Sequence, residues 1–187
     1  MPGKVFLTLL DQAQQQYGYL TPEDARELDA DPALLRQMAA RGTLERVARG
    51  VYRVPTVPPT PLDAYMQAVL WTGRKGVLSH ETALDLYELA DVNPSAIHLT
   101  VPRTFRTHRE IPHSYRLHRG DVSPEQTRWH EGLPIVTPET AIRGAKEQAL
   151  GWHLIDQAIE TARSRGLITA DAATQLAARH AGSHSDD

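Results

Sequence analysis

The sequence contains no cysteine among its 187 residues. This absence excludes a disulfide scaffold, thiol catalysis and any thiolate metal site, and it fits the reducing cytoplasm in which we expect the protein to act. No apolar run approaches the ~20 residues that a membrane-spanning helix needs, so we expect no membrane partner. The start, MPGKVFLTLLDQAQQQ, runs from a short apolar stretch into glutamines without a small-residue cleavage site, which is not the pattern of a secretion signal.

The sequence also lacks the short motifs of common enzyme sites. The segment GRKG at residues 73–76 has neither the glycine spacing nor the Ser/Thr of a P-loop, so it predicts a turn. There is no nucleophile elbow, no nuclease-type acid cluster with lysine, and no glycine-serine with paired aspartates as in a nucleotidyltransferase. We therefore expect no catalytic residues and no cofactor.

The histidines do not form a pattern of metal ligands. His108, His113 and His118 recur at a five-residue step, which does not place side chains together on a helix or a strand. His80 and His130, each followed by a glutamate, are interpreted as surface and helix-start residues. We expect no metal site.

Charge is balanced in total but unevenly distributed. The formal net charge is −3, and residues 1–54 carry seven basic and seven acidic side chains. Most of these acids lie at or before Asp31, and most of the bases follow it. Because the local field guides an anionic partner more than the total charge does, residues 32–54 can form a cationic surface.

The segment from Tyr19 to Val54 predicts two short helices, a turn and a β-hairpin. Thr21 before Pro22, with Asp24 at the third helical position, has the pattern of a helix N-terminus that runs to about Leu28. Asp31-Pro32 repeats the pattern and opens a second helix, which Gly42 ends. TLERVA, the turn Arg49-Gly50 and VYRV then predict a hairpin. This order is typical of a winged helix-turn-helix, and residues 4–16 predict a supporting helix before it.

The outward face of the second helix suits a DNA groove. Leu34, Leu35 and Met38 form one face, whereas Arg36 and Gln37 lie between two alanines on the other. Arginine can bind guanine with two hydrogen bonds, and glutamine can do the same with adenine. The predicted DNA-binding residues are Arg36, Gln37, Arg41, Arg46, Arg49 and Arg53.

The hairpin would add a second cationic element. With a two-residue loop at Arg49-Gly50, Arg46 is expected directly across from Arg53, and such like-charge pairs are unfavourable without a polyanion between them. The alternative is an arginine-rich solvated surface, since the chain prefers arginine to lysine throughout.

The predicted fold class is α+β. Residues 1–54 form the winged domain, and the proline-rich segment 55–61 is a stiff linker. Residues 62–180 form a mixed α/β domain, in which SAIHLTVP is a strand and residues from 137 onward are helices. The tail 181–187 is small, polar and expected to be disordered.

One segment of the larger domain is strongly basic. Residues 103–119 hold five arginines, three histidines and one acid, so they could contact phosphate, an acidic partner or only water. The predicted partner-binding residues are Arg103, Arg106, Arg109, Arg116 and Arg119.

The stretch GYLTPEDARELDADPALLRQMAARGTLERVARGVYRV resembles the N-terminal domain of the AbiEi family of antitoxins. The shared features are an aromatic before the first capped helix, the arginine- and glycine-rich second helix and wing, and a proline-rich exit. The resemblance continues more weakly through VLSHETALDLYEL, IHLTVPR and PIVTPETAIRGA.

The resemblance implies a non-enzymatic regulator of a bacterial toxin–antitoxin operon that represses its own operon at inverted repeats. The larger domain would counter a nucleotidyltransferase toxin encoded in the same operon. The protein is expected to be a monomer in solution, of which two copies could bind one operator. The alternative is a stand-alone regulator whose C-terminal domain senses a small molecule, because ligand pockets have no short motif.

Overall fold

The computed structural model describes residues 3–178, and these form two compact units. Within the described residues, the N-terminal unit comprises residues 3–76 with 129–134, and the C-terminal unit comprises 77–128 with 135–178. The proline-rich segment 55–61 therefore lies within the N-terminal unit, and the functional boundary predicted there stays a prediction. The predicted disordered tail 181–187 lies outside the described residues.

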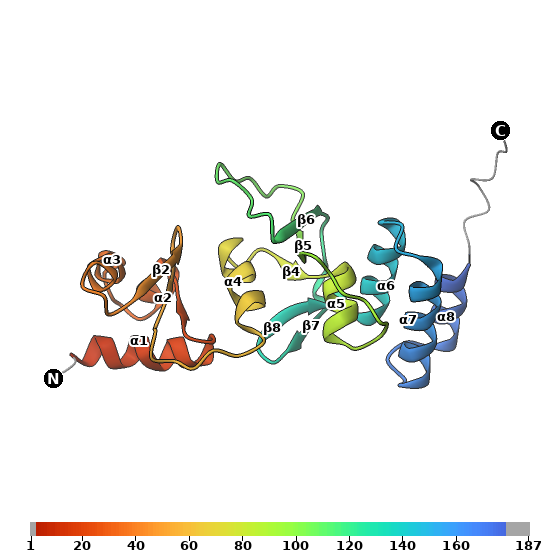
Figure 1. The fold of residues 1–187 in the computed structure, drawn as a ribbon, viewed down its shortest axis with the longest axis horizontal. Helices are drawn as coiled ribbons and strands as arrows, with labels where there is room; N and C mark the ends of the chain where they lie inside the picture. Colours follow the sequence, from red (N-terminus) through yellow and green to blue (C-terminus); the bar gives the residue numbers. More distant parts are fainter. Residues whose placement is uncertain (1–2, 179–187) are drawn as a thin grey trace. The chain divides into compact units, whose positions relative to one another are not determined.

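The N-terminal unit has the predicted order of helix, helix pair and hairpin, followed by a further helix, α4, in the segment that was predicted to belong to the larger domain (Figure 1). A short strand before the helix pair joins the hairpin in a three-stranded antiparallel sheet of order β1-β3-β2. Its elements are α1 (Lys4–Gln15), β1 (Tyr19–Leu20), α2 (Pro22–Glu27), α3 (Ala33–Ala40), β2 (Glu45–Ala48), β3 (Val51–Arg53) and α4 (Asp63–Trp71).

Local capping determines where the two helices of the helix-turn-helix begin. At α2, Thr21 N donates to Asp24 Oδ2 at 2.6 Å and Asp24 N donates to Thr21 Oγ1 at 3.4 Å, which is a capping box. At α3, Ala33 N donates to Asp31 Oδ1 at 2.8 Å. Gly42 follows α3 with φ of +75°, a conformation that favours glycine. The predicted boundaries of α2 are confirmed, and α3 begins one residue later than predicted, with Pro32 in place of Asp31 at the N-cap position.

One apolar core holds the N-terminal unit together. Leu9 and Ala13 of α1, Leu35 of α3 and Tyr52 of β3 are buried in it, together with Met38. Two helices as short as α2 and α3 could not bury enough apolar surface by themselves, so α1 and the sheet complete the core. The predicted supporting role of the first helix is confirmed.

A second sheet has five strands in the order β6-β5-β4-β8-β7. Its strands β4, β5 and β6 lie wholly in the C-terminal unit, and β7 and β8 each run partly through residues 129–134. β5 pairs parallel with β6 and antiparallel with β4, which pairs parallel with β8. The elements that follow α4 are β4 (Val77–Leu78), α5 (His80–Leu86), β5 (Ile97–Val101), β6 (Tyr115–Arg119), the 3₁₀ helix η1 (Pro124–Gln126), β7 (Thr127–His130), β8 (Leu133–Val136), α6 (Pro138–Glu147), α7 (Trp152–Ser164) and α8 (Ala170–Ala177).

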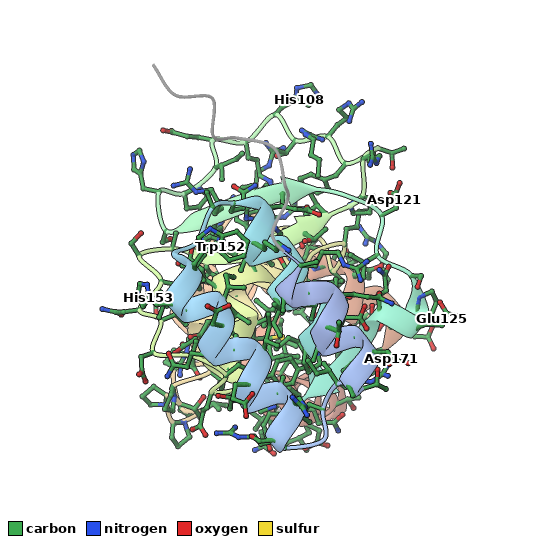
Figure 2. The ribbon with its side chains drawn as sticks, turned by 90° about the vertical axis from the view of Figure 1, so that its right-hand side faces the viewer. His108, Asp121, Glu125, Trp152, His153 and Asp171 are labelled. Carbon is green, nitrogen blue, oxygen red and sulfur yellow. The ribbon has the colours of Figure 1, made fainter. Side chains whose placement is uncertain are left out.

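The last three helices pack closely because small residues line their contacts. Ala141 and Ala145 of α6 and Ala158 and Ala162 of α7 are fully buried, and α7 and α8 run side by side in Figure 2. Larger apolar side chains from the sheet and helices, such as Ile135, complete this core. The α+β fold class is confirmed.

Candidate nucleic-acid interface

The second helix presents the predicted side chains outward. Leu35 and Met38 are buried, whereas Arg36 and Gln37 are exposed. Arg41, directly after α3, is also exposed. The helical period thus separates an apolar inner face from a polar outer face, as the sequence predicted.

The hairpin pairs in a different register from the predicted one. Glu45 lies opposite Arg53, and Arg46 lies opposite Tyr52. The expected Arg46–Arg53 pair is therefore wrong. Its cause is an irregularity between Arg46 and Ala48, which places one extra residue in β2 before the turn and shifts the partners by one position.

Arg53 differs from the other predicted DNA-binding residues in where its guanidinium lies. Its Nη2 donates to Val57 O at 2.9 Å and to Asp63 Oδ2 at 3.2 Å, and only 15% of its side chain is exposed. The side chain joins the end of the hairpin to the start of α4. A role for Arg53 in DNA binding stays a prediction.

Four arginines surround a cavity of about 410 Å³ in the N-terminal unit. Arg36 and Arg46 come from α3 and β2, and Arg49 comes from the turn of the hairpin. The fourth, Arg26 at the end of α2, was not among the predicted site residues. The only sequence signal for it is a single arginine in a helix whose other charges are acidic, which does not suggest an anion site.

A buried polar network stabilises the start of the helix-turn-helix. The Asp24 carboxylate is fully buried and accepts hydrogen bonds from Thr21 Oγ1 at 2.7 Å and Gln16 Nε2 at 3.0 Å. Arg74, in the turn after α4, donates to Asp24 Oδ1 at 2.6 Å. The predicted turn at 73–76 thus supplies the cation that balances this buried charge.

The predicted partner-binding arginines lie on and around the loop between β5 and β6. Figure 1 shows this loop extending away from the sheet, and Figure 2 shows His108 at its outer end. Arg106 Nη1 donates to Arg103 O at 2.9 Å, and Arg119 Nη1 donates to Phe105 O at 2.6 Å. Arg103, Arg106, Arg116 and Arg119 are exposed, and Arg109 is partly buried.

Three histidines that are distant in sequence meet in the C-terminal unit. His98 Nδ1 and His118 Nε2 are 3.1 Å apart, and the ring of His80 stacks on that of His118 with centroids 3.6 Å apart. The interpretation of His80 as a surface residue is wrong, because only 9% of it is exposed. Its place at the start of α5 is confirmed.

The sequence could not show this cluster. Parallel pairing of β5 with β6 brings His98 and His118 together, and that pairing joins segments separated by a long loop. The helix α6 approaches so closely that a Cβ on Gly144 would lie 2.9 Å from His80 Nε2. Ser79 occupies the N-cap position of α5, but its hydroxyl accepts from Thr100 Oγ1 at 2.9 Å instead of capping the helix.

Burial keeps the histidine cluster neutral. It lowers the pKa of His80 to about 3, with His118 and His98 adding to the shift, and it lowers the pKa of His118 to about 4. Burial also lowers the pKa of His98, although Glu81 opposes this. In the hydrogen bond between His98 and His118 one nitrogen must accept, so the two rings cannot both be protonated while it is formed.

A polar cavity of about 520 Å³ adjoins this cluster. Its lining includes Ser79, His80, Thr100, His118, Arg143 and Glu147. Within residues 3–178, no group of three or more histidine, aspartate or glutamate side chains is arranged to hold a metal ion.

The fold and the outward arginines define the class of protein. A supporting helix, a capped helix pair and a hairpin with arginines around it constitute a winged helix-turn-helix, which belongs to DNA-binding regulators. Residues 8–55 match the family described as "Transcriptional regulator, AbiEi antitoxin". The resemblance to AbiEi antitoxins is thereby confirmed over this segment.

The remaining comparisons concern the whole chain. Its fold is similar to that in the crystal structure of the RV2827C protein from Mycobacterium tuberculosis, with 16% sequence identity and a TM-score of 0.52. The match covers 94% of this chain and 76% of that chain. No curated protein matches the chain. None of the helices in residues 3–178 is long and apolar enough to cross a membrane.

Proposed function

We propose that this protein is an antitoxin and the autorepressor of a bacterial toxin–antitoxin operon, and that it acts without catalysis in the cytoplasm. The winged domain binds inverted repeats in the operator. The C-terminal unit counters a nucleotidyltransferase-type toxin encoded in the same operon. The observation that carries the proposal is the match of residues 8–55 to AbiEi regulators, in a segment whose exposed helix face holds Arg36 and Gln37.

The proposed division of roles follows from the chemistry of the exposed surfaces. Arg36 and Gln37 can read base edges, whereas Arg41, Arg46 and Arg49 can bind phosphates. The arginines of the loop between β5 and β6 would meet an acidic surface of the toxin or its RNA substrate. The proposed oligomeric state is a monomer in solution, with two copies on an inverted repeat.

DNA binding is tested with the full chain and the DNA upstream of its own operon. We expect nanomolar-range binding that weakens steeply with salt, because each phosphate contact releases counterions. Fluorescence anisotropy across a salt series measures the slope. Absence of binding at low salt would refute the operator-binding role.

Antitoxin activity is tested by co-expression with the neighbouring gene. Growth should be restored when the full chain is present, and a variant with the C-terminal unit removed should not restore it. Rescue by the winged segment alone would overturn the assignment of toxin neutralisation to the C-terminal unit.

The polar cavity beside the histidine cluster favours a second candidate function, in which the C-terminal unit senses a small molecule. In that case the protein would bind its operator but fail to rescue cells from the neighbouring gene product. A metabolite would then change operator affinity in the same anisotropy assay. Restored growth without any metabolite effect would exclude this candidate.

A further inference from the structure

The arginine-lined cavity of the N-terminal unit draws its cations from four separate elements. Arg26 ends α2, Arg36 lies on α3, Arg46 on β2, and Arg49 in the hairpin turn. Asp31 is the acid among the lining residues, and its Oδ1 already accepts the hydrogen bond from Ala33 N. The cavity is therefore strongly cationic.

Three of these arginines have no acidic partner in the part of the chain that the structure describes. Arg26, Arg36 and Arg46 form no salt bridge with residues 3–178. By contrast, Arg53 and Arg74 of the same unit bind aspartates. Guanidinium groups that converge repel one another, and an anion between them removes that cost.

The backbone around the cavity is fixed by packing on two sides. Tyr52, opposite Arg46, is buried at 3% exposure in the core. Gly50 at the hairpin turn, with φ of +77°, lies beside α2, where a Cβ on it would be 3.9 Å from Pro22 Cδ. The backbone elements that carry the arginines are thus placed before any ligand binds.

We propose that this cavity binds one phosphate of the DNA backbone, with Arg26 as a ligand beside Arg46 and Arg49, while Arg36 at the same cavity keeps its role at the base edges. The proposal rests on the proposed operator binding. Guanidinium groups match the oxygens of a phosphate in paired hydrogen bonds, and several of them surround an anion better than one. Arg26 then fixes α2 to the DNA backbone, and this contact helps determine which bases α3 reaches.

The first test compares Arg26→Ala with the full-length wild type on operator and unrelated duplexes. We expect affinity for both duplexes to fall by the same factor, roughly five- to tenfold, and the salt slope to decrease by about 0.9. The affinity of Arg26→Lys should lie between those of the wild type and Arg26→Ala, because lysine keeps the charge but lacks the paired donors of a guanidinium. Arg163→Ala, at an exposed position of α7, should match the wild type.

The second test replaces single operator phosphates by neutral methylphosphonates. The replacement at one position should weaken DNA binding by the wild type but not that by Arg26→Ala. Replacements at other sensitive positions should weaken DNA binding by both proteins equally. Circular dichroism melting should show that Arg26→Ala is folded, since its side chain is exposed.

The outcomes separate the inference from the proposed function. If wild type binds the operator and Arg26→Ala retains both affinity and slope, the phosphate site is refuted and operator binding stands. If wild type binds no duplex, operator binding itself fails. If millimolar inorganic phosphate stabilises wild type but not Arg26→Ala at equal ionic strength, while DNA binding is unchanged, the cavity is a small-anion site and the inference is overturned.

Discussion

At the scale of single residues, Asp24 and Arg74 form the most consequential ion pair of the N-terminal unit. Asp24 is fully buried, and 32% of the Arg74 side chain is exposed. Removing the cation would leave a buried carboxylate supported only by neutral donors. We expect Arg74→Ala to lower the free energy of unfolding by about 1–3 kcal/mol, a range reduced because solvent reaches the arginine. Urea denaturation followed by tryptophan fluorescence measures the change.

Arg103→Ala is the matched control. Its salt bridge to Asp121 spans 3.6 Å, with 77% and 69% of the two side chains exposed. Such an exposed pair contributes little to stability, so Arg103→Ala should change the free energy of unfolding by less than about 0.5 kcal/mol. Equal effects of the two substitutions would show that burial of Asp24 has no energetic consequence.

The histidine cluster predicts a pH dependence of stability. The pKa of His80 is lowered from 6.5 to about 3 in the folded protein. Below pH 6.5, therefore, His80 binds a proton in the unfolded chain but stays neutral in the folded protein until the pH approaches 3. The free energy of unfolding should therefore be highest, as far as His80 is concerned, above pH 6.5 and should decrease as the pH falls towards 3. The decrease is at most about 1.4 kcal/mol per pH unit for this group.

His80→Asn tests this dependence, because asparagine tolerates the φ of +53° that His80 adopts. The variant should have a smaller loss of Tm between pH 7.5 and 5.5 than the wild type. His153→Asn, at an exposed position of α7, should lose as much Tm as the wild type. If His80→Asn and the wild type lose Tm equally, His80 does not govern acid stability.

At the scale of elements, α4 belongs with the winged domain. Asp63 binds Arg53 at 3.2 Å, Gln67 accepts from the Tyr19 hydroxyl at 3.3 Å, and Arg74 follows the helix. We expect a fragment of residues 1–76 to melt cooperatively and to bind operator DNA. A fragment of residues 1–60 lacks all three contacts, so it should melt at a lower temperature and bind more weakly.

Thermal melting by circular dichroism and anisotropy on the same duplex compare the two fragments. Asp63→Ala in the full chain provides a further comparison, since it removes one contact without truncation. Identical melting and binding by both fragments would show that α4 is dispensable for the winged domain.

At the scale of the whole molecule, the two proposed activities should be separable by substitution. Replacing Arg106, Arg109 and Arg116 with Ser removes two cations from the loop between β5 and β6 and one from β6 itself. We expect this variant to lose rescue from the neighbouring toxin gene while it keeps operator affinity in a gel shift. The reason is that cationic partner surfaces act through complementary charge.

A second triple variant distinguishes this loop from general loss of charge. Arg128, Arg163 and Arg165 are exposed positions elsewhere in the C-terminal unit. Their replacement by Ser should leave both activities unchanged. Full rescue by the loop variant would mean that the loop arginines are only solvated.

Elements whose signals are local could be predicted from the amino-acid sequence alone. The capping box of Thr21 and Asp24, the glycine after α3 and the hairpin turn at Arg49-Gly50 each depend on a few adjacent residues. The outward face of α3 follows from helical period. The order of the helices and the exposure of Arg36 and Gln37 therefore need no information about distant parts of the chain.

Contacts between side chains that are far apart in the sequence, by contrast, depend on tertiary packing. One extra residue in β2 moves Arg46 away from Arg53, and the contact with α4 draws Arg53 inward. The convergence of Arg26 with the other cavity arginines depends on the packing of α2 against the hairpin, and the histidine cluster depends on pairing between distant strands. Strand register and burial are set by partners far along the chain, and no local pattern specifies those partners.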